Sequence, residues 1–363
     1  MNIFKKPLAF LLTALLCTAM AGIGITTVSA DSYFDDGDYR FAVKSDNTLA
    51  VAHYYGNETE LVLPERVGDR LVTGVHSRCF QNAEIVSVSL PRNYTDIGVS
   101  AFSGCTALTT VKLSLGLLSI GMMAFMGCTS LSSVDFEMPN NLTTIATAAF
   151  YGCTALETAE LPDTLTNLGE SAFYGCSVLH RVHISTGLTA VPANAFNRNA
   201  FERLQLHDGL LTIGAGAFAN NDSLTFVDFP LSLKKISAGA FANDNALEGV
   251  FVPDSVTSIG TDAFTPMIES DMFAVQCFEN SAAAEYFSEA QAADLNIYIK
   301  LYGDLNLDGA IDITDVTCVQ KYLAELEEIR YSALLEIADA NLDGEVDISD
   351  ATYIQCVIAG LIT

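Results

Sequence analysis

The sequence has 363 residues, of which 44 are acidic and 17 basic, so its formal net charge is -27. A surface this acidic repels nucleic acid and anionic lipid, which argues against nucleic-acid binding and leaves cations as natural partners. The length exceeds what one ordinary hydrophobic core holds, so we expect either several domains or a repeat array.

Residues 1–30 have the pattern of an export signal. Lys5 and Lys6 form a basic start, an apolar run follows from Leu8 to Ala21, and Val28-Ser29-Ala30 offers the small residues that a signal peptidase needs. No later stretch reaches the roughly 18 apolar residues that a membrane span requires. We therefore expect a secreted, extracellular protein without a membrane span.

A phenylalanine recurs at a nearly constant spacing through the middle of the chain. It returns every 22 to 25 residues, at Phe80, Phe102, Phe125, Phe150, Phe173, Phe196, Phe218, Phe241 and Phe264. Around one copy the unit reads Leu108-x-x-Val111-x-Leu113, then Ile120-Gly121, then Ala124-Phe125-x-Gly127-Cys128. A period of about 20 to 29 residues with several aliphatic positions per unit is typical of leucine-rich-repeat stacking. One unit cannot bury its own apolar face, so neighbouring units must stack.

The alternation inside a unit predicts a strand. Val111 and Leu113 alternate with Thr110 and Lys112, the period-two pattern of a strand with one buried face. Stacked units therefore predict a solenoid of short parallel β-strands with about nine coils. The Ile120-Gly121 pair predicts a second short extended stretch, and the phenylalanine is expected to close the coil from inside.

One position of the unit accepts cysteine, asparagine or aspartate. Three residues after the repeat phenylalanine the chain carries Cys105, Cys128, Cys153, Cys176, Asn199, Asn221 and Asp244. A position with this tolerance indicates a side chain that bonds to backbone at a turn, not half of an obligatory disulfide. A disulfide between adjacent coils is still compatible with a strand spacing of about 4.8 Å. No CxxC spacing occurs among these cysteines, which argues against a metal site.

The recurrent unit Ile-Gly-x-x-Ala-Phe-x-Gly-Cys resembles the BspA-like bacterial leucine-rich-repeat proteins over roughly residues 50–300. The stretch Ser281–Tyr286 is also similar to the C-terminal cap of such arrays. The expected boundaries are 31–79 for an N-terminal cap and first repeat, 80–270 for the repeats and 271–300 for the cap. The resemblance implies adhesion or protein binding more than a fixed reaction.

Basic residues gather in two coils of the array. Between Leu113 and Leu233 the only basic residues are three arginines, and three of the five histidines lie beside them. The hypothetical ligand patch comprises His180, Arg181, His183, Arg198, Arg203, Gln205, His207, Phe226 and Phe251. It would recognise an acidic glycan or a carboxylate-rich protein surface. The alternative is that these cations only offset neighbouring acids such as Glu160, Glu202 and Asp208.

An acidic motif of twelve residues occurs twice near the C-terminus, beginning at Asp304 and, 35 residues later, at Asp339. Calcium takes six to eight oxygen ligands, and a loop with oxygens at positions 1, 3, 5, 7, 9 and 12 wraps one ion. Gly309 and Gly344 supply the sharp turn at position 6. The motif predicts two Ca²⁺ ions, held by Asp304, Asn306, Asp308, Ala310 (carbonyl), Asp312 and Asp315, and by Asp339, Asn341, Asp343, Glu345 (carbonyl), Asp347 and Asp350. Position 9 binds directly or through water.

The duplicated loops over residues 301–363 resemble a type I dockerin. Aspartate stands at both twelfth positions, where EF-hands commonly use glutamate, and each loop is followed by one helix, the F-hand arrangement. The resemblance implies a cohesin module of a scaffoldin as partner, and hence association with the cell surface in a cellulosome. By position it implies cohesin contacts at Ile313, Thr314, Gln320, Lys321, Ile348, Ser349, Gln355 and Cys356. The structural alternative is a free-standing calcium sensor with paired EF-hands.

Only Lys300 to Gly303 separates the expected cap from the first acidic loop, so we expect the two parts to hold a fixed relation. Proteins with dockerins are often glycoside hydrolases, which makes a carbohydrate-active protein, by glycan binding or O-glycosyl hydrolysis, the alternative function. The chain has no tryptophan and no insertion that would build a cleft for two carboxylates. No G-x-S-x-G, HExxH or glycine-rich phosphate loop occurs. We expect a non-enzymatic component of a polysaccharide-degrading complex.

Overall fold

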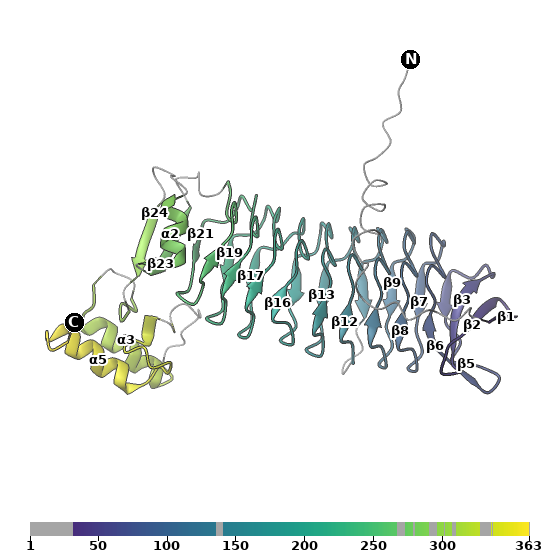
Figure 1. Ribbon diagram of the computed structural model, residues 1–363, viewed down its shortest axis with the longest axis horizontal. Helices are drawn as coiled ribbons and strands as arrows, with labels where there is room; N and C mark the ends of the chain where they lie inside the picture. Colours follow the sequence, from purple (N-terminus) through teal and green to yellow (C-terminus); the bar gives the residue numbers. More distant parts are fainter. Residues whose placement is uncertain are drawn as a thin grey trace, which may run out of the picture.

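The chain forms a long β-solenoid that ends in a small helical unit (Figure 1). The computed structural model describes residues 32–135, 141–266, 273–278, 280–289, 296–300, 302–306, 310–326, 335 and 337–362. The expected export signal and the predicted ligand Asp308 lie outside the described residues. Among the described residues no helix is long and apolar enough to cross a membrane.

An antiparallel meander closes the N-terminal end of the solenoid. Strand β1 (Tyr33–Asp36) pairs with β2 (Tyr39–Val43), which pairs with β3 (Leu49–Tyr54). Strand β3 then pairs in parallel with β6 (Arg70–Val75), through which the same sheet continues into the solenoid, and β5 (Arg66–Val67) forms a hairpin with β6. The meander therefore covers the edge that the first coil would otherwise expose.

Each coil contributes a three-residue strand to one face and a two-residue strand to another, both in parallel stacks, as the sequence predicts. The three-residue strands are β4 (Glu60–Val62), β7 (Ser87–Ser89), β9 (Thr110–Lys112), β11 (Ser133–Asp135), β13 (Thr158–Glu160), β15 (Arg181–His183), β17 (Arg203–Gln205), β19 (Phe226–Asp228) and β21 (Gly249–Phe251). The two-residue strands are β8 (Asp96–Ile97), β10 (Ser119–Ile120), β12 (Thr144–Ile145), β14 (Asn167–Leu168), β16 (Ala190–Val191), β18 (Thr212–Ile213), β20 (Lys235–Ile236) and β22 (Ser258–Ile259). In β9 the central Val111 is buried while Thr110 and Lys112 are exposed.

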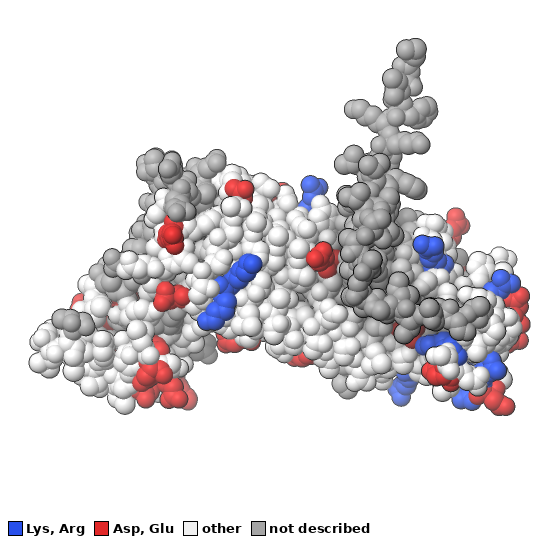
Figure 2. All heavy atoms as spheres, in the orientation of Figure 1, with Lys and Arg blue, Asp and Glu red and all other residues white. Residues whose placement is uncertain are grey.

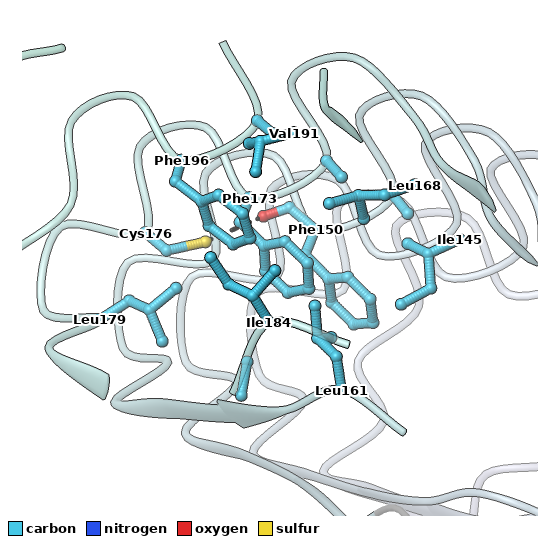
Figure 3. Close-up of a cluster of buried hydrophobic side chains, with 14 of the residues drawn as sticks. Ile145, Phe150, Leu161, Leu168, Phe173, Cys176, Leu179, Ile184, Val191 and Phe196 are labelled. Atoms are coloured by element: carbon cyan, nitrogen blue, oxygen red, sulfur yellow. Dashed lines mark hydrogen bonds between the residues drawn. The ribbon is translucent and has the colours of Figure 1, made fainter. Parts of the chain in front are cut away.

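The nine repeat phenylalanines form a buried column, which we call the phenylalanine column. Neighbouring rings lie nearly parallel, with centroids 5.0 to 5.6 Å apart from Phe80 to Phe264. Figure 3 shows Phe150, Phe173 and Phe196 in this arrangement, surrounded by aliphatic side chains. Burying one such side chain contributes about 1.5–3 kcal/mol, so the column is a main source of the array's stability.

Backbone carbonyls of the column accept hydrogen bonds from the side chains that stand three residues after each repeat phenylalanine. The Sγ of Cys128 donates to the carbonyl of Phe102 at 3.1 Å, and that of Cys176 to the carbonyl of Phe150 at 3.2 Å (Figure 3). Asn221 donates from Nδ2 to the carbonyl of Phe196 at 3.1 Å. The cysteines in the described part of the chain are free thiols. The position therefore bonds to backbone, as its tolerance for asparagine predicts.

The array divides at the coil that follows Phe173. Strand β14 does not pair with β16, and β15 does not pair with β17, so both faces lack strand pairing at this boundary. In the described part of the chain the face of three-residue strands is also unpaired between β11 and β13 and between β19 and β21. The ring spacing in the column is 5.0 to 5.2 Å up to this boundary and 5.5 to 5.6 Å beyond it.

Two residues account for the break. Gly169 donates its N–H to the carbonyl of Ile145 one coil earlier, but the next coil has Pro192 at this position, which has no N–H to donate. The leucine that precedes the three-residue strand in neighbouring coils is replaced by Phe201, which is fully buried and packs edge-on against Phe196 and Phe218. One coil thus lacks a hydrogen bond to its neighbour and holds a larger side chain in its interior.

The C-terminal end of the solenoid is closed by two strands and a helix. Strands β23 (Ala274–Phe278) and β24 (Asn296–Lys300) continue the face of β21 in parallel. Helix α2 (Ala282–Glu289) packs over the last coil, where the ring of Phe287 lies 5.5 Å from that of Phe264. The end of the phenylalanine column is thereby covered.

Helices α3 (Ile313–Leu323) and α5 (Ile348–Ile358) pack together in the C-terminal unit, and Leu335, Ile337 and Ala338 are helical as well. Their shared core contains Val316, Val319, Ala351 and Ile354, and it also includes Phe278 of strand β23. Because a residue of the solenoid cap belongs to this core, the helical unit is packed onto the cap.

Candidate binding sites

The second acidic loop folds its oxygen-bearing side chains back onto its own backbone. Asp339 accepts hydrogen bonds from the N–H of Asp343 at 3.0 Å and of Gly344 at 2.9 Å, and Asp343 accepts one from Glu345 at 3.0 Å. Gly344 has a φ of +91°, a conformation that favours glycine at the turn. The loop therefore holds the predicted ligands on one tight curve of chain.

The twelfth positions of both loops are buried carboxylates. Asp315 and Asp350 are each 0% exposed. Asp350 accepts from the N–H of Asn341 at 3.2 Å and of Asp347 at 2.8 Å, and so ties the start of its loop to the start of α5. Asp315 accepts the corresponding bonds from Asn306 and Asp312. Burying a carboxylate that retains its charge is costly, and a divalent cation offsets that cost.

The donor set fits a hard cation such as calcium, because all predicted ligands offer oxygen. In the described residues, from which Asp308 is missing, no three histidine, cysteine, aspartate or glutamate side chains are gathered closely enough to hold a metal ion. The carboxylates instead accept hydrogen bonds from loop amides. The predicted ligands of the two acidic loops therefore have the oxygen chemistry, and the order along the loop, that calcium binding requires.

Position 9 of each loop caps the following helix. Asp312 accepts from the N–H of Thr314 at 2.7 Å, and Asp347 accepts from that of Ser349 at 2.6 Å. Hydrogen bonds from Thr314 and from Ser349 lower the pKa of Asp312 and of Asp347 respectively. Each of these aspartates thus uses one oxygen as an N-cap, a role that Asp-x-x-Asp before an apolar run could have indicated in the sequence.

The residues that the dockerin resemblance assigns to cohesin contact form two equivalent sets. Ile313 and Ile348 are 61% and 62% exposed at the starts of α3 and α5. The hydroxyl of Thr314 accepts from Nδ2 of Asn306 at 2.7 Å, and that of Ser349 from Nδ2 of Asn341 at 2.6 Å. Position 3 of each loop is therefore hydrogen-bonded to the residue that follows the exposed isoleucine.

The remaining members lie one turn or more further along the same helices. Gln320 and Gln355 are exposed, whereas Lys321 and Cys356 are half-buried. Exposed apolar side chains at matching places of two packed helices indicate a contact surface for a protein.

A hollow of about 810 Å³ opens on the solenoid where β15 and β17 fail to pair. We call it the junction hollow. Of the predicted ligand patch, the structure brings seven residues together on its lining: His180, Arg181, His183, Arg203, Gln205, His207 and Phe226. In the view of Figure 2, basic side chains are few along the middle of the solenoid.

Two members of the predicted patch lie elsewhere. The guanidinium of Arg198 lies over the ring of Tyr174, 6.0 Å from its centroid. Phe251 packs edge-on against Phe278 at the base of the helical unit, with ring centroids 5.9 Å apart. Arg198 lies outside the three-residue strands, and Phe251 lies in β21, two coils beyond Arg203 and against the core of the helical unit, which sequence spacing alone could not reveal.

Acidic groups accompany the cations of the junction hollow. Arg181 forms a 2.7 Å ion pair with Glu160, and His183 lies 3.1 Å from Asp163. Backbone and side-chain hydrogen bonds from Thr186 and His183 lower the pKa of Asp163 to about 2. Arg203 lies over the ring of Phe226, 4.3 Å from its centroid. The hollow is thus a mixed surface in which Arg203 presents its charge on an aromatic face.

Two aromatic features of the structure have only weak signals in the sequence. The ring of Tyr302, just before the first acidic loop, stacks on Phe278 of the cap. At the opposite end Tyr33 and Tyr55 are 50% and 48% exposed on the N-terminal meander. An aromatic residue beside a loop or in a short polar strand is a weak signal by itself, because many such residues are simply packed.

Two known families match this chain, one in its repeat region and one in its C-terminal region. Residues 73–178 and 143–270 match the BspA type Leucine rich repeat region, in six copies, and residues 302–356 match the Dockerin type I domain. The comparison with curated proteins gave no match.

Solved structures resemble the solenoid. A leucine-rich repeat protein from Bacteroides ovatus is 21% identical, over 76% of this chain and 67% of that chain, with a TM-score of 0.58. A Leucine Rich Repeat protein of T. pallidum is 25% identical, over 60% of this chain and 91% of that chain, with a TM-score of 0.47. The first of these likenesses supports the leucine-rich-repeat fold.

Proposed function

The chain belongs to the BspA type leucine-rich repeat family and ends in a type I dockerin domain, and from these two facts we propose that it is a secreted binding protein held on a scaffoldin. A dockerin implies a cohesin partner and a cellulosome-type assembly. In this role the protein is extracellular and joins the cell surface through the scaffoldin. The solenoid displays a ligand site and the dockerin anchors it within a polysaccharide-degrading complex.

The observation that carries the proposal is the pair of exposed isoleucines, Ile313 and Ile348, beside the two acidic loops. Type I dockerins bind calcium, and we assign one ion to each loop. The first would be held by the side chains of Asp304, Asn306, Asp308, Asp312 and Asp315 and the carbonyl of Ala310; the second by those of Asp339, Asn341, Asp343, Asp347 and Asp350 and the carbonyl of Glu345. Bound calcium supplies positive charge to the buried carboxylates and so favours the folded loops.

The cohesin surface has approximate twofold symmetry in its residues. Ile313 and Thr314 in the first copy correspond to Ile348 and Ser349 in the second, whereas Lys321 and Cys356 differ. The near-identical pairs allow a cohesin to engage either copy, and the Lys–Cys difference makes the two orientations unequal. Asn306 and Asn341 link each calcium loop to these contact residues through their hydrogen bonds to Thr314 and Ser349.

Calorimetric titration of type I cohesin modules into the full-length protein tests the proposal. With calcium we expect binding to at least one cohesin, weakened by Ile313→Asp or Ile348→Asp alone and reduced more than about 100-fold by the double variant, because a charge would be desolvated in either orientation. Leu361→Asp, at an exposed leucine that is not one of the assigned contact residues, is the control. Undiminished binding by the double variant would exclude this surface.

A second proposal concerns the junction hollow, and the broken pairing between β15 and β17 supports it. We propose that it receives an acidic glycan or a carboxylate-rich protein segment, with Arg203 and Arg181 as the anion-binding groups. Guanidinium groups bind carboxylates in a bidentate manner, and Arg181 could exchange Glu160 for a ligand carboxylate. The alternative, in which the cations serve only to neutralise Glu160 and Asp163, predicts no ligand.

Titration with pectin fragments and acidic peptides separates these alternatives. The wild type should bind one of these probes, and the double variant Arg181→Ala and Arg203→Ala should bind it at least about tenfold more weakly. Arg198→Ala removes a cation of the same two coils that lies outside the hollow, and it should bind as the wild type does. Equal responses from all three proteins would leave only the neutralising role.

A further inference from the structure

A second hollow lies at the far N-terminal end of the molecule, on the outer face of the meander. Its volume is about 390 Å³, and its lining consists of Tyr33, Arg40, Ala52, His53, Tyr55 and His76. We call it the N-terminal hollow. Among the exposed large apolar side chains of the described residues, its two tyrosines are the only aromatic ones. Both therefore project into solvent at one place.

Strand pairing explains why these side chains share a face. Arg40 of β2 is the partner of His53 in β3, and Asp35 of β1 is the partner of Arg40, so all three point to the same side of the meander. Tyr33 lies two residues before Asp35 and shares its side. Ala52 is too small to fill the space between the rings, which leaves a depression with aromatic walls.

The walls are held by specific contacts. The ring of His53 lies edge-on to Tyr55 with centroids 4.7 Å apart, and that of His76 lies edge-on to Tyr33 at 6.1 Å. The guanidinium of Arg40 is 5.7 Å from the centroid of Tyr55. These contacts orient the two tyrosines before any ligand arrives, which lowers the entropic cost of binding.

The charged side chains beside the hollow form an ion pair. Arg40 contacts Asp35 through two bonds, from Nε at 2.9 Å and from Nη2 at 3.3 Å, and the hydroxyl of Tyr55 donates to the same carboxylate at 3.3 Å. Basic and acidic side chains lie together at this end of the molecule (Figure 2). The pair presents fixed donors and acceptors, with nearly no net charge to attract an ion.

We propose that the N-terminal hollow binds a sugar ring of a neutral polysaccharide. Such a ring has an apolar face of C–H groups, which suits the face of a tyrosine, and a rim of hydroxyls, which suits the Arg40–Asp35 pair. A volume of about 390 Å³ is near the lower end for ligand pockets, and it suits one or two rings of a longer chain. The open side of the hollow lets the rest of the chain continue into solvent.

Two other occupants fit less well. An anionic ligand would meet Asp35 beside Arg40 and gain little from a pair that is already neutral. A second copy of this chain would need a far larger apolar area than two tyrosines, because stable interfaces bury about 800 Å² on each partner. The site is distinct from the dockerin and from the junction hollow, and its occupancy does not rest on cohesin binding.

Affinity electrophoresis of the calcium-loaded full-length protein through gels that contain xylan, xyloglucan, mixed-linkage β-glucan or galactomannan tests the proposal. We expect retardation by at least one neutral polysaccharide. Tyr33→Ala and Tyr55→Ala should each weaken it at least about tenfold, whereas Tyr33→Phe should retain it because the ring remains. Both tyrosines are half-exposed, so truncation should leave the fold intact, which circular dichroism checks.

Matched controls separate this site from the rest of the surface. Leu118→Ala removes a comparably exposed apolar side chain in mid-array, and the double variant Arg181→Ala and Arg203→Ala removes the cations of the junction hollow. Both should be retarded as the wild type is. Absence of retardation by every neutral gel would overturn the proposal, and so would retardation that survives both alanine substitutions or that occurs only in pectin gels.

Discussion

The ring of Phe278 stacks on that of Tyr302, with centroids 4.3 Å apart and planes inclined by 14°. The first residue ends strand β23 of the solenoid cap, and the second lies two residues before the first acidic loop. Phe251 of the last three-residue strand extends the contact edge-on. The dockerin is therefore packed against the cap of the solenoid, in agreement with the short connection in the sequence.

Breaking this stack should loosen the dockerin. We expect Tyr302→Ala to lower the free energy of unfolding of the calcium-loaded helical unit by about 1–3 kcal/mol, because the ring contact of the half-buried Tyr302 with the buried Phe278 is lost together with its apolar area. Differential scanning calorimetry would record the change as an earlier transition for this unit. Tyr322→Ala, on a half-buried tyrosine of α3 outside the shared core, is the control and should shift that transition less.

Calcium removal should affect the cap as well as the dockerin. The buried carboxylates of Asp315 and Asp350 repel other loop acids once the ions leave, so α3 and α5 should unfold and uncover Phe278. Hydrogen exchange with a chelator should then speed up in α3, α5, β23 and β24, while strands β7 to β17 keep their protection.

Asp350→Asn weakens calcium binding at one loop only, whereas the chelator removes calcium from both loops. It removes one charged ligand and should weaken calcium binding to the second loop at least about tenfold. Glu325→Gln, at an exposed position after α3, should bind calcium normally. Unchanged exchange in α3 and α5 after chelation would contradict the role assigned to the ions.

Asp244 should make the later coils less stable as the pH rises. Burial raises its pKa to about 9 from an ordinary value of 3.8, so the folded chain holds a proton that the unfolded chain releases. The contribution of Asp244 to the free energy of unfolding is therefore fully present below pH 3.8, and it is lost as the pH rises from that value to about 9. At the same position Asn221 needs no such proton to donate a hydrogen bond.

Asp244→Asn should consequently stabilise the array by about 1–3 kcal/mol at neutral pH and by much less near pH 4. Urea unfolding at several pH values, compared with wild type, gives the difference and cancels the titration of the calcium loops, which both proteins share. Asp254→Asn, which changes an exposed aspartate, is the control and should alter the stability at neutral pH much less. A pH-independent gain for Asp244→Asn would contradict the raised pKa.

Thiol reactivity should separate the cysteines into two groups. Burial raises the pKa of the Cys176 thiol to about 12 and raises those of Cys79 and Cys153 well above their ordinary value. Cys318 and Cys356 are half-exposed on the dockerin. An aromatic disulfide reagent should therefore modify these two in the native protein and the solenoid cysteines only after denaturation. Fast native labelling of Cys153 would contradict the buried arrangement.

Much of the solenoid could be predicted from the sequence, because its signals repeat. The spacing of Phe80 to Phe264 and the alternation around Val111 each occur in coil after coil, so a single irregular unit does not hide them. The family matches and the structure confirm the leucine-rich-repeat solenoid and the dockerin. The same sequence pattern thus predicts the same local structure in every coil.

Features that occur once were harder to predict. Pro192 and Phe201 look like ordinary substitutions within a repeat, and only the unpaired strands β15 and β17 reveal that they open the junction hollow. The same limit explains why the sequence does not separate Arg198 and Phe251, which lie outside the lining of the hollow, from Arg181. A single side chain's direction depends on local packing, and no periodic pattern reports it.

The phenylalanine column also fixes a length and a direction. Its eight steps of 5.0 to 5.6 Å carry the solenoid over roughly 40 Å, so the meander and the dockerin are held apart as if by a strut. Tension between a substrate at one end and a scaffold at the other would pull along the hydrogen bonds that join coil to coil. Strand pairing is missing from both faces between the coils of Phe173 and Phe196, so under load the rod should part there first.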